Sequence, residues 1–168
     1  MDTAEPAADH VDLILRQWSR ELPDTATDGA AILARARRIT LRVRRDIEAV
    51  FERHGLDTGQ FDVLATLRRA GPPFRLRPTE LYRSLMISSG GLTDRLQRLE
   101  RAGLIRRRAD DEDGRSLLVE LTDTGRERIE AAFREDMAIE NSLVAGLDPE
   151  ERAALAGLLR RLALSIGA

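Results

Sequence analysis

The residues of this chain that could do chemistry are its arginines and acids, because the usual catalytic and metal-binding residue types are scarce. The 168 residues include no cysteine and two histidines. Without cysteine, thiol catalysis and cysteine-based zinc sites are excluded. His10 and His54 lie far apart and offer no metal-ligand spacing. No Ser/His/Asp set or Gly-rich phosphate loop is present either, so we expect neither an enzyme, a metal site nor a cofactor.

The arginines are concentrated in one part of the chain. The net charge is −2, yet residues 75–108 hold nine arginines against three acids. A basic segment on a nearly neutral chain is the electrostatic pattern of a surface that binds phosphate groups. The sequence therefore predicts a nucleic-acid contact in this segment.

One helix in the basic segment, expected over 89–102 and capped by Ser88 or Ser89, has the pattern of a DNA-reading element. Leu92, Leu96 and Leu99 share one face, and small or polar residues lie opposite. Such a face can enter a major groove, with glycines allowing close approach of a phosphate. The alternative is a solvent-exposed face with an Asp94–Arg98 pair. The expected DNA-contacting residues are Ser88, Ser89, Gly90, Gly91, Thr93, Asp94, Gln97, Arg98 and Arg101.

A charged hairpin follows this helix, with strands expected over 104–109 and 117–121. The seven-residue turn 110–116 is longer than stability alone favours, because short loops close hairpins best. As a wing it could place Arg115 in a minor groove, with Asp113 holding the guanidinium. The alternative is a mobile surface loop.

The remaining elements must position this helix and hairpin. Apolar periodicity and capping residues predict further helices over 11–22, 29–53, 57–71, 78–85, 122–146 and 148–166. We therefore expect a mainly α fold with a small β-hairpin wing, a winged helix-turn-helix. No signal peptide or apolar run of membrane-spanning length is seen, so a cytoplasmic protein is expected.

Several motifs together resemble the MarR family of bacterial transcriptional regulators. They are T-E-L at 79–81, T-D-R-L-Q-R-L-E-R-A-G-L-I-R-R at 93–107, D-D-E-D-G-R-S at 110–116 and L-T-D-T-G at 121–125. The resemblance implies a homodimer with interlocked terminal helices, usually a repressor, bound to a palindromic operator and so associated with the nucleoid. It also implies dimerisation helices at 30–56 and 122–168 and a DNA-binding lobe at 57–121, in a single intertwined domain. The helix expected at 1–22 is an addition that a minimal family member does not need.

Two charged residues point to a ligand. Arg95 lies at the edge of the leucine face, and Asp62 lies between apolar neighbours, so each needs a partner. Together with Trp18 and Arg107, and with F-D-V-L-A-T-L-R-R-A-G-P-P at 61–73, they resemble the urate-responsive branch of the family. In that branch the corresponding four residues bind a small organic anion between the dimerisation and DNA-binding lobes. The alternative is a structural Asp62–Arg95 salt bridge with Trp18 in the core.

The resemblance predicts a repressor that leaves its operator when urate, or a polycarboxylate such as trans-aconitate or citrate, binds. A constitutive or architectural DNA-binding protein without an effector is the alternative. A winged-helix module that binds only proteins is disfavoured by the positive charge of Arg98, Arg101 and Arg115.

Overall fold

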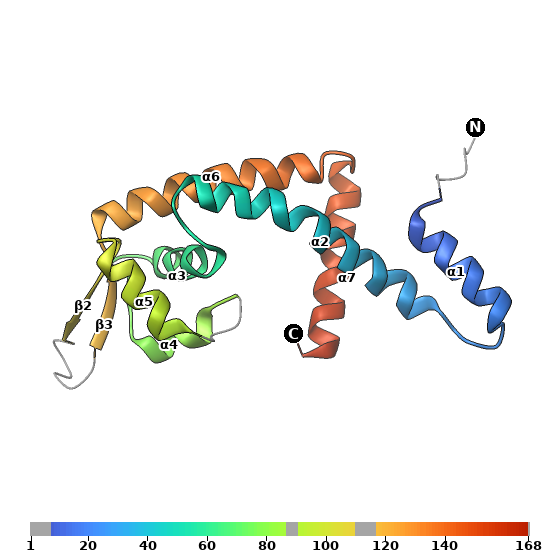
Figure 1. Cartoon of the computed structure of the whole chain (residues 1–168), viewed down its shortest axis with the longest axis horizontal. Coiled ribbons are helices and arrows are strands. Elements are labelled where there is room, and N and C mark those ends of the chain that lie inside the picture. Colours follow the sequence, from blue (N-terminus) through green and yellow to red (C-terminus); the bar gives the residue numbers. More distant parts are fainter. Residues whose placement is uncertain (1–7, 87–90, 110–116, 168) are drawn as a thin grey trace. The chain divides into compact units, whose positions relative to one another are not determined.

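The computed structural model describes residues 8–86, 91–109 and 117–167 of the chain (Figure 1). The chain divides into two compact units, Met1–Arg45 and Asp46–Ala168. The first contains α1 (His10–Glu21) and most of α2 (Asp28–Arg53). The second contains the end of α2 and every later element. Among the described residues, none of the helices is long and apolar enough to cross a membrane.

The first unit is held together by one arginine. Asp9 caps α1 by accepting from the backbone N–H of Asp12, which is 2.9 Å away. Arg35 of α2 reaches both acids, with Nε 2.9 Å from Asp9 and Nη2 2.5 Å from Asp12. The hydrogen bond from the backbone N–H of Asp12, together with those from Arg35, lowers the pKa of Asp9 to about 2. Val11 of α1 is also buried. The ion pairs of Arg35 with Asp9 and Asp12 therefore join α1 to α2.

The second unit has the architecture of a winged helix-turn-helix. Its helices are α3 (Thr58–Arg69), α4 (Pro78–Ser84), α5 (Leu92–Arg101), α6 (Asp123–Leu143) and α7 (Pro149–Ile166). Its strands are β1 (Arg75–Leu76), β2 (Ile105–Ala109) and β3 (Leu117–Leu121), which form an antiparallel sheet in the order β1-β3-β2. Figure 1 shows α5 beside the β2–β3 hairpin, and α3 against α6. The predicted fold class is therefore confirmed.

Apolar side chains from α3, α4, α5, the sheet and α6 make one core. Its fully buried members include Leu64, Leu67, Leu81, Leu99, Leu104, Val119 and Ile129. Gly125 allows the start of α6 to lie directly on the backbone of Leu104, because a Cβ there would overlap the Leu104 carbonyl group. Helix α5 and the β2–β3 strands are thus built on the same core as the start of α6.

Most predicted boundaries agree with the structure to within a few residues. Thr122 and Asp148, whose types favour N-caps, each cap a helix by accepting a backbone N–H. Of Asp57 and Thr58, the two candidates for the cap of α3, the structure has Asp57. Gly103 ends the α5 segment with a φ of 69°, a conformation that suits glycine.

Two predictions about the basic segment are wrong. The helix expected from residue 89 begins at Leu92, and its cap is Gly91 rather than Ser88 or Ser89. Gly91 has a φ of 75°, a left-handed conformation that glycine adopts without strain. The sheet has three strands rather than the two predicted. The additional strand, β1, has only two residues, which is too short to show the alternation by which a strand is predicted from sequence.

Candidate nucleic-acid interface and effector site

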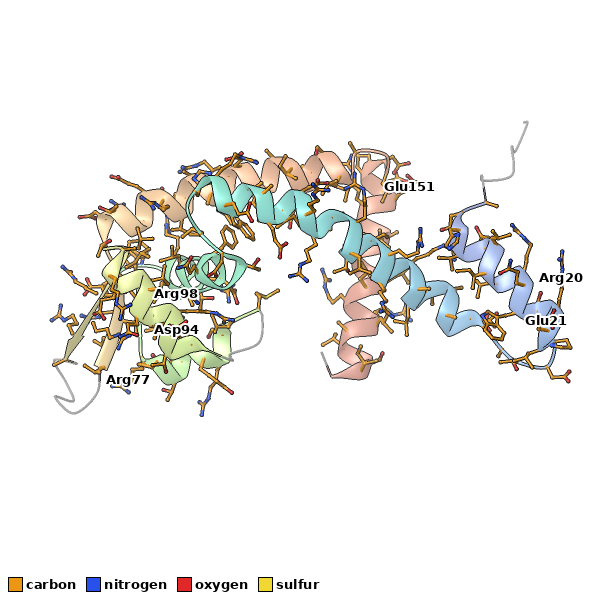
Figure 2. All side chains as sticks on the ribbon, in the orientation of Figure 1. Arg20, Glu21, Arg77, Asp94, Arg98 and Glu151 are labelled. Atoms are coloured by element: carbon orange, nitrogen blue, oxygen red, sulfur yellow. The ribbon has the colours of Figure 1, made fainter. Side chains whose placement is uncertain are left out.

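The outer face of α5 carries the described residues predicted to contact DNA. Leu96 and Leu99 are buried, whereas the opposite face is exposed. Asp94 and Arg98 lie one turn apart on that exposed face (Figure 2). Ser88, Ser89 and Gly90, and also Asp113 and Arg115 of the predicted wing, lie outside the described residues. The exposed residues are Gly91, Thr93, Asp94, Gln97, Arg98 and Arg101.

Arg98 is oriented by two carboxylates. Its guanidinium lies 3.0 Å from Asp94, the pair that the sequence offered as an alternative, and 3.5 Å from Asp57, the cap of α3. The Arg98 side chain remains 48% exposed. A guanidinium has five N–H donors, so these two contacts fix its direction and leave donors for a phosphate or a base edge.

A depression of about 560 Å³ adjoins the exposed face of α5. Residues of α4, including Thr79, Tyr82 and Arg83, line it together with Leu92 and Thr93. Tyr82 is 56% exposed. These α4 residues were not predicted from the sequence as part of the surface around α5, although an aromatic residue in a short polar helix was a usable signal. Hydroxyl and guanidinium groups here extend the polar face of α5 onto α4.

The outer face of the hairpin is held by an acid between arginines. Glu120 of β3 lies 2.7 Å from Arg106 and 3.8 Å from Arg108 of β2. The hydrogen bond from Arg106 holds the pKa of Glu120 below its usual range and raises that of Arg106. These pairs hold the two arginines of β2 alongside β3.

Arg95 turns away from the exposed face of α5 and packs against α3. Its guanidinium lies over Gly59, where a Cβ would come 2.7 Å from Arg95 Cζ. Asp62, three residues further along α3, is 6% exposed and accepts a hydrogen bond of 2.9 Å from the backbone N–H of Met86. Arg95 and Asp62 therefore both link α3 to the helix-turn-helix segment. Sequence reasoning missed Gly59, although a glycine in a helical segment was a signal.

Arg107, predicted to bind the ligand, contacts Glu100 of α5. It lies half-buried on the inner side of the hairpin, with Nε 3.4 Å from Glu100 of α5, while its backbone N–H donates to Glu100 at 3.2 Å. Its Nε and Nη2 are buried and make no hydrogen bond within the described residues. Arg107 thus joins β2 to the last turn of α5 and keeps unused donor capacity.

Trp18 lies on α1, in the first unit, whereas Asp62, Arg95 and Arg107 lie in the second. Its side chain is 51% exposed. The exposed indole is therefore not part of the hydrophobic core of the described residues. Its apolar surface is available to a ligand or a partner.

Comparison with known proteins decides the family. The MarR family model matches residues 54–116. The HTH-type transcriptional regulator PecS of Dickeya dadantii is 36% identical over 149 residues, covering 89% of this chain and 90% of PecS. The chain belongs to the MarR family. Members of this family are DNA-binding transcriptional regulators, so the expectation of a regulator rather than an enzyme is confirmed.

Solved MarR-family structures share the fold. A mutant MarR from E. coli complexed with operator DNA has 25% identity and a TM-score of 0.66, covering 86% of this chain and 96% of that one. BpsR of Bordetella bronchiseptica, whose DNA binding is regulated by 6-hydroxynicotinic acid, has 28% identity and a TM-score of 0.61. That match covers 75% of this chain and 91% of BpsR.

Proposed function

We propose that this MarR-family regulator is a homodimeric repressor that a small organic anion releases from a palindromic operator. The observation that carries the proposal is the position of Arg95. It belongs to the same helix as the groove-facing residues, yet it packs on α3 beside buried Asp62. An anion that engages Arg95, or that repels Asp62, would act directly on the helix that reads DNA.

The effector residues proposed within the second unit are Asp62, Arg95 and Arg107. The resemblance to the urate-responsive branch adds Trp18 on sequence grounds alone. Two arginines suit a planar or multiply charged anion, because a guanidinium offers paired donors in one plane. Arg107 has buried donors that no described residue satisfies by a hydrogen bond, which supports a role in anion binding. Urate, citrate and trans-aconitate all have suitable charge. BpsR, regulated by 6-hydroxynicotinic acid, provides a precedent among the structural relatives.

Release of the operator would follow from the thermodynamic linkage between anion binding and DNA binding. A ligand that binds better to the arrangement of α5 that does not fit DNA shifts the population toward that arrangement. Because the backbone N–H of Met86 donates to Asp62, a charge placed near Asp62 would also disturb the backbone at Met86.

The proposed homodimer would bury apolar side chains that are exposed on the single chain. On α7 these are Leu155, Leu158, Leu159, Leu164 and Ile166. Apolar patches of this size are typical of association surfaces. A dimer would place two copies of α5 on two half-sites of a palindrome.

The test is a gel-shift titration with the intergenic DNA upstream of the gene, in the presence of urate, citrate or trans-aconitate. We expect at least one anion to raise the protein concentration needed for half-saturation by tenfold or more. Arg95→Ala should reduce this response more than it reduces DNA binding itself. Collapse of DNA binding in Arg95→Ala, with the remaining complex still released by the anion, would show that our role for Arg95 is wrong.

A constitutive DNA-binding protein is the second candidate, because Arg95 and Asp62 could be purely structural. It predicts that all three anions leave the complex intact. In either case Arg115→Ala should weaken binding to any DNA sequence and reduce the salt dependence of that binding.

A further inference from the structure

Asp57 connects the N-terminus of α3 to the exposed face of α5. Its Oδ1 accepts from the backbone N–H of Gln60 at 2.8 Å and so caps α3. Its Oδ2 lies 3.5 Å from Nη1 of Arg98. The same carboxylate therefore makes two contacts. Only the contact with Arg98 depends on its negative charge, because asparagine caps a helix about as well as aspartate does.

Asp94 completes a cluster of one guanidinium and two carboxylates. Its Oδ2 lies 3.0 Å from Nη2 of Arg98, one turn away on α5 (Figure 2). The side chains of Asp57, Asp94 and Arg98 are 47%, 67% and 48% exposed, so all three are accessible to a partner that contacts α5. The cluster carries an excess of negative charge on the face of α5 that is predicted to read DNA.

This charge balance changes what Arg98 can contribute to binding. A DNA duplex presents phosphate groups whatever its sequence, and an arginine with no acid beside it attracts all of them. Here the two carboxylates lie within 3.5 Å of the guanidinium, well inside the screening length of about 8–10 Å, and they cancel most of that attraction. The remaining N–H donors can still make directed hydrogen bonds to a base edge, such as O6 and N7 of guanine. Arg98 thus gains more from a matching base than from a phosphate.

We infer that Asp57 is a specificity-determining residue of this regulator. Its carboxylate weakens the attraction of Arg98 for the phosphates of unrelated DNA and holds the guanidinium in a direction suited to a base edge. The inference rests on the proposed function, because it requires that α5 reads an operator. Asp94 lies on α5 itself, whereas Asp57 lies at the start of α3. The direction of Arg98 therefore also depends on how α5 packs against α3.

The first experiment compares Asp57→Asn with the wild type, as full chains, by fluorescence anisotropy on two DNA duplexes of equal length. One duplex carries the operator, defined as the segment that the wild type protects in footprinting of the upstream intergenic DNA, and the other has an unrelated sequence. We expect unrelated DNA to bind at least about threefold more tightly to the variant, with a steeper dependence on salt, and the operator to gain less. An unchanged ratio of the two affinities would overturn the inference.

Asp148→Asn is the matched control. Asp148 caps α7 in the same way, by accepting from the backbone N–H of Glu151 at 2.9 Å, and the substitution removes the same charge. It should leave both affinities at the wild-type values. An equal gain for unrelated DNA in this control would assign the effect to the net charge of the protein and overturn the role of Asp57. Asp57→Ser, which also keeps a capping oxygen without the charge, should reproduce the shift seen with Asp57→Asn.

A double-mutant cycle with Arg98→Ala tests whether Asp57 acts through Arg98. In the Arg98→Ala background, Asp57→Asn should have little effect on either duplex, because the guanidinium that the carboxylate restrains is gone. An undiminished gain would show that Asp57 repels phosphates directly and would overturn the part given to Arg98.

The wild type separates this inference from the proposed function. If the wild type binds the intergenic DNA no better than unrelated DNA, the proposed function is wrong. If the wild type prefers its operator and Asp57→Asn keeps the same preference, the proposed function stands and only the inference about Asp57 is overturned.

Discussion

Arg95 crosses α3 directly above Gly59, so closely that any Cβ at position 59 would overlap its guanidinium. The two residues are far apart in the sequence, and each is unusual where it stands. Glycine inside a helix costs about 0.5–1 kcal/mol relative to alanine, and a half-buried arginine needs compensating contacts. Each therefore accounts for the other: the glycine provides the space through which Arg95 reaches α3 near Asp62.

This relationship predicts coupling between the two positions. Gly59→Ala should stabilise the protein by about 0.5–1 kcal/mol in an Arg95→Ala background, through helix propensity. In the wild type the same change should give little or no gain, because Arg95 must move. Urea unfolding of the four proteins of this double-mutant cycle measures the difference. An equal effect of Gly59→Ala in both backgrounds would contradict the contact.

Arg101 is predicted to contribute to DNA binding by charge alone. It lies exposed in the last turn of α5. Arg101→Ala should weaken binding several-fold on any sequence and lower the slope of log affinity against log salt by about one. Arg128→Ala, also exposed but on α6, is the control. Fluorescence anisotropy with operator and unrelated DNA at several salt concentrations gives both quantities, and an unchanged slope would remove Arg101 from the interface.

Thr122 is predicted to stabilise the junction between the hairpin and α6. Its hydroxyl accepts from the backbone N–H of Gly125 at 3.0 Å and donates to the carbonyl oxygen of Gly103 at 2.7 Å. Thr122→Ala should lower the free energy of unfolding by about 1–2 kcal/mol, as for other helix N-caps. Thr122→Ser keeps the hydroxyl and should lose much less. Chemical denaturation compares them, and equal losses would show that the methyl group matters rather than the hydrogen bonds.

Asp136 is predicted to make stability depend on pH. It is 3% exposed on α6, its Oδ1 has no hydrogen-bond partner among the described residues, and burial together with nearby Glu140 raises its pKa from 3.8 to about 6. The folded state thus binds a proton that the unfolded state releases between these values. The free energy of unfolding should fall as pH rises through this window, by up to roughly 3 kcal/mol, and the loss should be complete above it.

Asp136→Asn tests this directly. It keeps the shape but cannot ionise, so it should be more stable than the wild type at pH 8 by about 2 kcal/mol. Glu130 and Glu135 have lowered pKa values, and their stabilising charge is lost at acidic pH in both proteins. The difference between the two proteins therefore isolates Asp136. A difference that does not vary between pH 4 and pH 8 would show that Asp136 is not protonated in the folded state.

Local chemistry in the sequence determined the element order, the fold class and the exposed face of α5. Leucine spacing separated the buried from the exposed side of that helix, and the caps at Asp57, Thr122 and Asp148 could be predicted because they depend on neighbours three residues away. The motifs between 79 and 125 were sufficient to suggest the family. Each of these features depends on residues close in sequence, where spacing and geometry are tied together.

Only the tertiary structure decided which charges meet. It placed Arg95 on Gly59, joined Asp62 to the backbone of Met86, paired Arg107 with Glu100, and began α5 at Leu92 after a left-handed Gly91. It also brought Asp57, the cap of α3, to Arg98 of α5. An arginine side chain is long and flexible, and its guanidinium can donate to any acid or carbonyl oxygen within reach. Its partner is therefore set by how the helices pack and not by the residues that flank it in the sequence.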